Sequence, residues 1–429
     1  MTFVKLLKRS GQLLLVPVVI CLIVFSLMAL SYLLPTEQMK EHTKDSFPIF
    51  GKEGPYYPTD GQKGTVRDNF IDALYMDQAI VNVNDADLLK CVMNGYDWSW
   101  QDPSRPIENL EAAVTDPESV SLVNTEHRFV NGHVIFVKLL LFILSYSGIR
   151  IFGLCLCGIL IVLLGWMMYR RGYGRCILPV MLSVWFLRPI TIGMNMTFMG
   201  IFVCTMVPCI LMLAVKKETL EKRTWLFFAV TGSVTFCFNM NYFQLISFGM
   251  LLMQNLMITG VPEKPGKMAL KILDLFIAWM AGYAGTMVFK WIFYALTIDG
   301  NMFAEMMKHM SMRSAEDESS RLGAVWFNMK IAFGSLWFDI PEAIFLIYSL
   351  IHWKKNKIGF AFSSAEILFT AAMLLIPVAR LAILANHSWV HAWFTYRVLM
   401  LPVLAVNMLM VLHPMHPKDS AVVRDLKPV

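Results

Sequence analysis

Long runs of apolar residues, separated by short polar segments, extend along the chain to about position 412. A run of about 20 apolar residues can cross the ~30 Å hydrocarbon layer of a membrane as a helix. The pattern therefore predicts an all-α integral membrane protein with about ten transmembrane helices. The predicted crossings are Leu13–Leu34, Ile149–Tyr169, Cys176–Leu187, Met194–Val215, Trp225–Asn241, Phe243–Ile258, Met268–Ile298, Pro341–His352, Ala365–Leu384 and Ala392–Leu412.

One long polar segment follows the first apolar run and predicts the division of the chain. We expect a membrane anchor helix at 1–34, an extracytoplasmic loop with short amphipathic helices at 35–134, a multi-helix transmembrane domain at 135–412 and a cytoplasmic tail at 413–429. Within the loop, the apolar spacing between Asp68 and Ile80 predicts a short helix on the membrane surface. The apolar run Val134–Tyr146 is too short to cross and predicts a re-entrant or interfacial helix.

Lysine and arginine gather in clusters at every second predicted loop, which sets the predicted orientation. Basic residues near the ends of spans stay on the cytoplasmic side, so both termini are expected in the cytoplasm of a bacterial plasma membrane protein. The chain is 57% hydrophobic and 16% charged, against about 25% charged for soluble domains. Its net charge of +6 is accounted for by anionic lipid and indicates no nucleic-acid partner.

The first candidate site lies at the predicted outer mouth between the last two spans. His387 and His391 are four positions apart and share one face of a helix, and Tyr396 and Arg397 follow. Imidazoles and a guanidinium that converge at an interface can bind a phosphate or diphosphate head group. The two histidines alone are a weak metal signal. The alternative is an interfacial aromatic belt with histidines that cap a helix.

Two further candidates lie in the long polar loop. Asp68 and Asp72, also four apart, can act as a general base or hold a divalent cation, and the alternative is a solvated loop face. His127 and Arg128 precede the predicted re-entrant helix, where they can bind an anion or simply extend toward the interface. The sequence names no certain cofactor.

Several of these stretches together resemble a known family. The segment Asp68–Met76, the stretch ending at Arg150, and residues 386–397 are similar to bacterial multi-pass proteins that resemble the C-type membrane glycosyltransferases. The resemblance implies transfer of a sugar from a polyprenyl-phosphate donor to an envelope glycan or lipid acceptor, outside the membrane. It makes Asp72 or Asp68 the base or the metal-binding acid, and it makes His387, His391 and Arg397 the contacts of the lipid phosphate. The stretch Arg128–Gly132 departs from these relatives in lacking a Trp and a His.

Two other readings remain open. A transporter or flippase of a lipid-linked or anionic solute would place charges near the middle of the bilayer. A non-catalytic membrane protein that organises partners would tolerate changes at Asp68, His387 and Arg397. Because the charges gather at the predicted outer boundary, we favour the glycosyltransferase.

Overall fold

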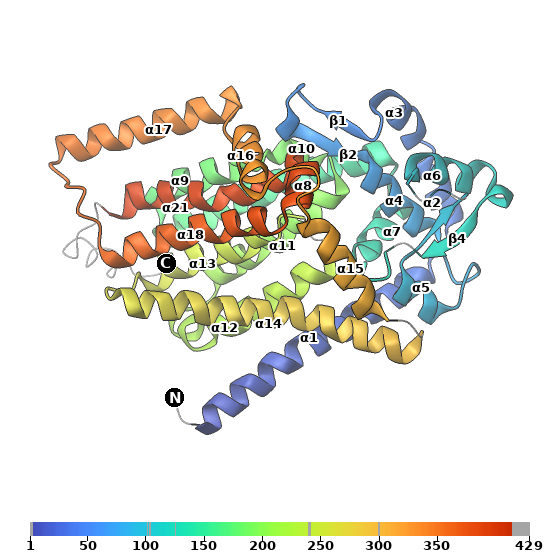
Figure 1. The fold of residues 1–429 in the computed structure, drawn as a ribbon, viewed down its shortest axis with the longest axis horizontal. Helices are drawn as coiled ribbons and strands as arrows, with labels where there is room; N and C mark the ends of the chain where they lie inside the picture. Colours follow the sequence, from blue (N-terminus) through green and yellow to red (C-terminus); the bar gives the residue numbers. More distant parts are fainter. Residues whose placement is uncertain are drawn as a thin grey trace.

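The computed structural model describes residues 3–100, 102, 104–124, 126–238, 242–298 and 301–413. The predicted tail at 413–429 lies almost wholly outside these residues. Within them the chain is an all-α membrane protein with two small two-stranded sheets (Figure 1). The helix α1 begins and α21 ends toward the same end of the molecule, away from the polar part of the fold.

The polar part contains short elements that surround one buried helix, α4. Its two sheets are antiparallel, with Tyr56 opposite Asp68 in one and Tyr96 opposite Asn124 in the other. The elements of this part are α2 (Glu37–Thr43), α3 (Ser46–Glu53), β1 (Tyr56–Pro58), η1 (Lys63–Thr65), β2 (Val66–Asp68), α4 (Asn69–Ile80), α5 (Leu88–Asn94), β3 (Tyr96–Ser99), α6 (Pro106–Thr115), η2 (Pro117–Ser119), β4 (Ser121–Asn124) and α7 (His133–Ile143).

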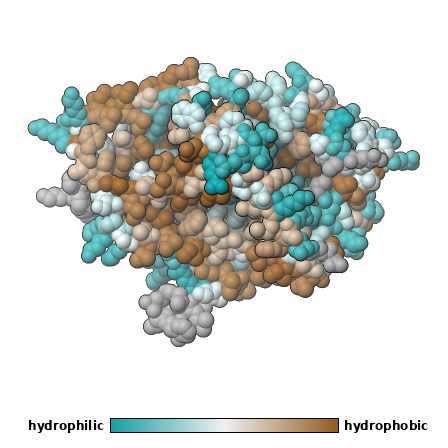
Figure 2. Space-filling model, viewed as in Figure 1, coloured by the Kyte–Doolittle hydropathy of each residue, from teal (hydrophilic) through white to brown (hydrophobic). Residues whose placement is uncertain are grey.

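The remaining helices form the apolar part of the fold. In Figure 2 hydrophobic residues cover much of the middle of this view, and hydrophilic residues gather toward both ends of its long axis. These elements are α1 (Phe3–Tyr32), α8 (Tyr146–Arg170), α9 (Gly174–Phe186), α10 (Pro189–Gly193), α11 (Met196–Ala214), α12 (Lys217–Phe238), α13 (Leu245–Thr259), α14 (Pro265–Thr297), α15 (Met302–Ser314), α16 (Arg321–Ala332), α17 (Leu336–Lys355), α18 (Ser364–Ile383), α19 (Ala385–Val390), α20 (Ala392–Thr395), η3 (Tyr396–Leu399) and α21 (Met400–Leu412).

The described residues contain six helices that are long and apolar enough to cross a membrane. The number rises to seven if α16 and α17, which meet at a bend of 83°, are one broken span. The predicted count of ten is not confirmed. Two predicted crossings, α9 and α13, are helices of only 13 and 15 residues, about 20 Å long at 1.5 Å per residue. The six helices are Arg9–Tyr32, Tyr146–Arg170, Met196–Ala214, Pro265–Thr297, Ser364–Ile383 and Ala392–Leu412.

The helix predicted between Asp68 and Ile80 is present as α4, but it is buried rather than lying on a surface. Carboxylates occupy its first turn, and the buried ammonium of Lys138 donates to the carbonyl oxygen of Ala79 at 2.7 Å in its last turn. A cation at the C-terminal end of a helix complements the helix dipole. Lys138 comes from α7, the predicted re-entrant segment, so α7 holds α4 in place. The prediction that this helix lies on the membrane surface is wrong, because the polar residues of α4 find partners inside the fold.

Two glycines bring α12 and α14 into close contact. A Cβ atom at Gly282 would overlap the carbonyl oxygen of Ala229, and one at Gly232 would overlap that of Trp279. Small residues at helix crossings let backbones approach closely, which is a main source of packing energy between helices in lipid. This contact fixes α14, the long helix that leads to α15 and the candidate site.

Candidate functional site

The acidic pair Asp68 and Asp72 lies at the buried N-terminus of α4. Asp68 caps the helix by accepting the Ile71 amide hydrogen at 3.2 Å. Asp72 accepts from the Tyr146 hydroxyl at 2.9 Å and from the Met196 amide at 3.0 Å. The two residues are 3% and 0% exposed, so neither belongs to a solvated loop face.

Burial changes the acidity of both carboxyl groups. It raises the pKa of Asp68 to about 8, to which the nearby Asp72 also contributes. It raises the pKa of Asp72 to about 7, although Arg150 acts in the opposite direction. Among the described residues neither carboxylate forms an ion pair within 4.0 Å. A carboxyl group whose pKa lies near neutrality can accept a proton from a substrate hydroxyl.

An ion-pair network beside α4 holds this pair in position. Arg150 forms a two-bond contact with Glu53, at 3.0 and 2.9 Å, and also donates to the Tyr146 hydroxyl at 2.9 Å. Arg67 lies 3.0 Å from the same Glu53 carboxylate. Since Tyr146 in turn donates to Asp72, the network links α3 and α8 to the acid pair. Glu53 was not predicted from the sequence, because its position does not distinguish it from the other acidic residues of the segment 35–134.

The two histidines at positions 387 and 391 lie together, as their four-residue spacing predicted. The rings of His387 and His391 are 4.9 Å apart. Burial, followed by the charge of Arg313, lowers the pKa of His391 to about 4. Burial, followed by His391, Arg380 and Arg313, lowers the pKa of His387 well below its usual value. Both imidazoles are therefore neutral at neutral pH, and each can donate one hydrogen bond and accept another.

The positive charge at this place belongs to Arg313 and Arg380 rather than to the histidines. Burial, followed by the charges of Arg128 and of Arg313 at the end of α15, lowers the pKa of His309. Burial and the neighbouring Arg128 lower the pKa of Arg313 itself. Arginines that gather in this way suit an anionic ligand. Arg313 was not predicted from the sequence, because it comes near the histidines only through the packing of α15 against α19.

Tyr396 and Arg397 meet the loop that carries Asp68. The Tyr396 hydroxyl donates to the Gly64 carbonyl oxygen at 2.8 Å, and Arg397 Nη2 lies 3.3 Å from the same oxygen. Arg397 is fully buried, and its other nitrogens donate to the carbonyl oxygens of Leu187 and Trp393. These contacts position the loop, and the predicted phosphate contact of Arg397 stays a prediction.

A tyrosine and a phenylalanine lie between the acid pair and the histidines. The Tyr242 hydroxyl is 3.5 Å from Asp68 Oδ2. The Tyr242 ring lies 4.7 Å from that of Phe394, which stacks on His391 at 5.3 Å. The backbone carbonyl of Tyr242 accepts from Arg380 at 2.6 Å. The structure thus brings together two predicted stretches that are more than 300 positions apart.

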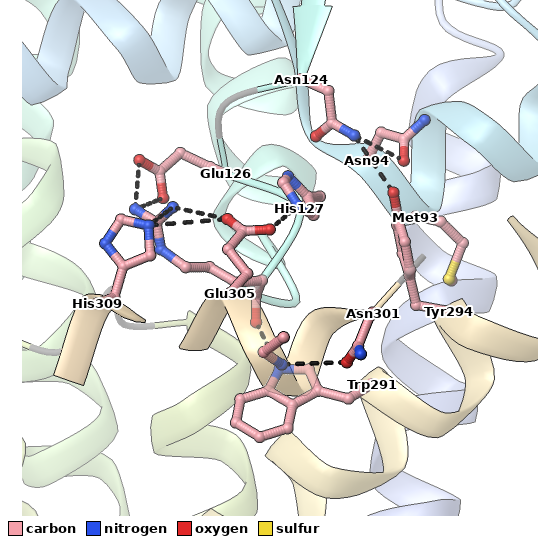
Figure 3. A network of polar contacts seen from close by, with 12 residues as sticks. Met93, Asn94, Asn124, Glu126, His127, Trp291, Tyr294, Asn301, Glu305 and His309 are labelled. Carbon is pink, nitrogen blue, oxygen red and sulfur yellow. Dashed lines mark hydrogen bonds and ion pairs between the residues drawn. The ribbon is translucent and has the colours of Figure 1, made fainter. Parts of the chain in front are cut away.

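The third predicted stretch forms a polar network with α15 (Figure 3). His127 Nε2 lies 2.6 Å from Glu305, and Arg128 donates to Glu126 at 3.0 Å. His309 Nε2 lies 3.7 Å from the same Glu305 carboxylate. His127 and Arg128 therefore fix α15, and with it Arg313, against the polar part of the fold.

The described residues contain no group of three or more His, Cys, Asp or Glu side chains placed to hold a metal ion. Comparison with family models, with curated proteins and with solved structures found no match. The chemistry of the site therefore has to be argued from its geometry. That geometry offers a carboxyl group of raised pKa, two neutral imidazoles and several guanidinium groups near one outer edge of the helices.

Proposed function

We propose that the chain is a membrane glycosyltransferase that transfers a sugar from a polyprenyl-phosphate donor to a hydroxyl group of an envelope glycan or lipid. In this proposal the site faces outward from a bacterial plasma membrane, and both termini lie in the cytoplasm. The polyprenyl chain occupies lipid beside the apolar helices. The relation between Asp68, Tyr242 and the histidines carries the proposal.

Asp68 is the proposed general base. Among the described residues its Oδ2 atom has only the 3.5 Å contact with Tyr242, whereas Asp72 is held by Tyr146 and by the Met196 amide. A base needs a free lone pair and a pKa near the working pH. Both residues meet the pKa requirement, but Asp68 has the freer oxygen, so Asp72 instead serves as a positioning residue for the first turn of α4.

Arg313, Arg380, His387 and His391 are the proposed phosphate contacts. The acceptor oxygen forms a bond to C1 of the sugar, and the bond between C1 and the phosphate oxygen breaks. The acceptor proton passes to Asp68, and polyprenyl phosphate leaves with the bonding electrons. Guanidinium and imidazole N–H groups fixed near the leaving oxygen stabilise the negative charge that develops there.

Purified chain in liposomes, given a polyprenyl-phospho-sugar and a lipid acceptor, tests the proposal. We expect transfer of radiolabelled sugar, and a loss of at least about 100-fold in Asp68→Asn because general-base catalysis contributes this much. Asp77→Asn is the matched control, since Asp77 is buried in the same helix but accepts from the Trp98 amide instead. Equal transfer by Asp68→Asn and wild type would remove Asp68 from the mechanism.

The same liposomes separate the transporter alternative. A transporter would move the intact lipid-linked or anionic solute across the bilayer without breaking the bond between sugar and phosphate. Recovery of unchanged donor in the opposite leaflet, with no labelled product, would replace the glycosyltransferase proposal with transport.

A further inference from the structure

A groove separate from the acid pair opens beside the turn between α9 and α10. Its volume is about 380 Å³, and the turn between β1 and η1, the end of η1 and the bend between α16 and α17 form the rest of its wall. In Figure 1 these elements lie near one another. Polar and apolar residues line the groove, among them Thr65, Trp185, Arg188, Ile190, Ser335 and Trp337.

Arg188 is the buried cation of this groove. It is only 8% exposed, and among the described residues its Nε and Nη2 atoms have no hydrogen-bond partner. Its Nη1 atom donates to the carbonyl oxygen of Phe186 at 3.3 Å. Its Cζ atom also lies 5.9 Å from the centroid of the Phe186 ring and 5.5 Å from that of the Phe338 ring. Ring faces attract the cation but do not replace an N–H···O hydrogen bond, so the two open donors still call for an anion or water.

The backbone at Arg188 supports this interpretation. Its φ of 60° lies in the left-handed region, which a non-glycine residue occupies only when its surroundings hold it there. Pro189 follows directly and makes helical geometry at position 188 still less favourable. Strain of this kind often accompanies ligand sites. Here the residue in the left-handed region is one that lines the groove.

The rim of the groove is apolar and exposed. Trp337 is 70% exposed and Ile190 is 53% exposed. The indole of Trp185 donates to the Trp337 carbonyl oxygen at 3.1 Å and ties the two sides of the rim together. Tryptophans are typical of the membrane–water boundary. A buried cation beside an exposed apolar rim matches a molecule with an anionic head and an apolar chain.

We propose that this groove binds the phosphate head group of a membrane lipid, with Arg188 on the phosphate and the lipid chain against Trp337 and Ile190. Asp60 also lines the groove, but its carboxylate accepts from the Thr65 hydroxyl and from the Gln62 amide. Among the described residues no carboxylate lies within ion-pair distance of Arg188. The proposal is independent of sugar transfer, because Asp68, His387 and His391 do not line the groove.

Competition for fluorescent phosphatidic acid on the purified full chain in maltoside detergent tests the site. We expect unlabelled phosphatidic acid and farnesyl phosphate to compete at least tenfold better than inorganic phosphate or diacylglycerol. Arg188→Gln should weaken binding at least tenfold. Arg321→Gln, whose exposed guanidinium pairs with Glu316 at 2.9 Å, should bind as wild type does. Comparing phosphatidic acid with farnesyl phosphate shows whether a glycerolipid or a prenyl lipid binds the groove more tightly.

A second measurement needs no substitution, so misfolding of Arg188→Gln cannot obscure the answer. Phosphatidic acid with a photoreactive group in its chain should crosslink wild-type protein at peptides that contain Ile190 or Trp337. Excess farnesyl phosphate should prevent the crosslink. Equal competition by diacylglycerol or by inorganic phosphate, or crosslinks spread evenly over the apolar helices, would overturn the proposal.

Discussion

The hydroxyl of Tyr396 donates to the carbonyl oxygen of Gly64 at 2.8 Å, across 332 positions of the sequence. Arg397 reaches the same oxygen at 3.3 Å. The loop that carries Asp68 is therefore fastened to the helices near the other end of the described chain. Any mechanism that uses the acid pair depends on this attachment.

Removal of these donors should cost stability in proportion to the number of carbonyl groups left without a partner. We expect Tyr396→Phe to lower the free energy of unfolding by about 1 kcal/mol, because Gly64 keeps its bond to Arg397. Arg397→Met should cost about 3 kcal/mol or more, since the Leu187 and Trp393 carbonyls also lose a donor. Denaturant titration in detergent measures both. A greater loss in Tyr396→Phe than in Arg397→Met would contradict this ranking.

Glu53→Gln should be among the more damaging single changes in the polar part. Glu53 joins Arg67 and Arg150, both at most 8% exposed. Loss of the shared carboxylate would leave two buried cations close together, at a cost of about 3–5 kcal/mol. The exposed Glu316→Gln change, which breaks the Arg321 pair, is the control and should cost less than about 1 kcal/mol. Similar unfolding midpoints for the two variants would argue against the network.

Gly282→Ala tests the contact between α12 and α14. The added methyl group would overlap the Ala229 carbonyl oxygen and push the helices apart, so we expect a loss of about 1–3 kcal/mol. Gly158 lies in α8 with no atom within 4 Å of a Cβ placed there. Gly158→Ala should therefore be neutral or slightly stabilising. Thermal unfolding of both variants in the same detergent measures the difference, and equal melting temperatures would exclude a tight crossing.

Stability should depend on pH through the acid pair. The pKa of Asp68 is about 8 in the folded chain, against about 3.9 for an ordinary aspartate. Between these values the folded chain holds a proton that the unfolded chain has lost, so stability should fall as pH rises from about 4 to about 8. Asp68→Asn removes this pH-dependent contribution to stability. Its melting temperature should vary less with pH than that of wild type, and parallel curves for the two would be evidence against a buried, protonated Asp68.

Sugar transfer should show the opposite dependence on pH. The proposed base acts only when ionised, so kcat/KM should rise about tenfold for each pH unit below the pKa and level off above it. The plateau should begin near the value of about 8 given for Asp68. Single-turnover rates from pH 5.5 to 9 measure the profile. A rate that is independent of pH in this range would exclude Asp68 as the base.

The sequence predicted the elements of the site better than the contacts between them. Apolar spacing identified the helix that begins after Asp68, and the four-residue interval placed His387 beside His391. Nothing local indicated that Arg150 would bind Glu53, because that pair depends on how α3 packs against α8. Arg313 lies near the histidines only because α15 packs against α19.

The number of spans shows a second limit. Apolar runs such as Cys176–Leu187 read as crossings, yet α9 has 13 residues, too few for a bilayer of about 30 Å. Hydropathy reports that a segment avoids water, and it does not distinguish lipid from the interior of a protein. The burial of α4 was not predicted for a related reason, because its polar residues bind side chains and backbone groups elsewhere in the fold.

The bond between Tyr396 and Gly64 also orders events during biosynthesis. A chain emerging from the ribosome exposes Gly64 and Asp68 long before Tyr396 has been made. The acidic loop therefore lacks its hydrogen bond to Tyr396 until α20 and α21 have been synthesised and inserted. Interruption of synthesis before that point would leave an inserted protein whose acidic loop lacks its bond to Tyr396. Completion of the site therefore depends on the synthesis of α20 and α21.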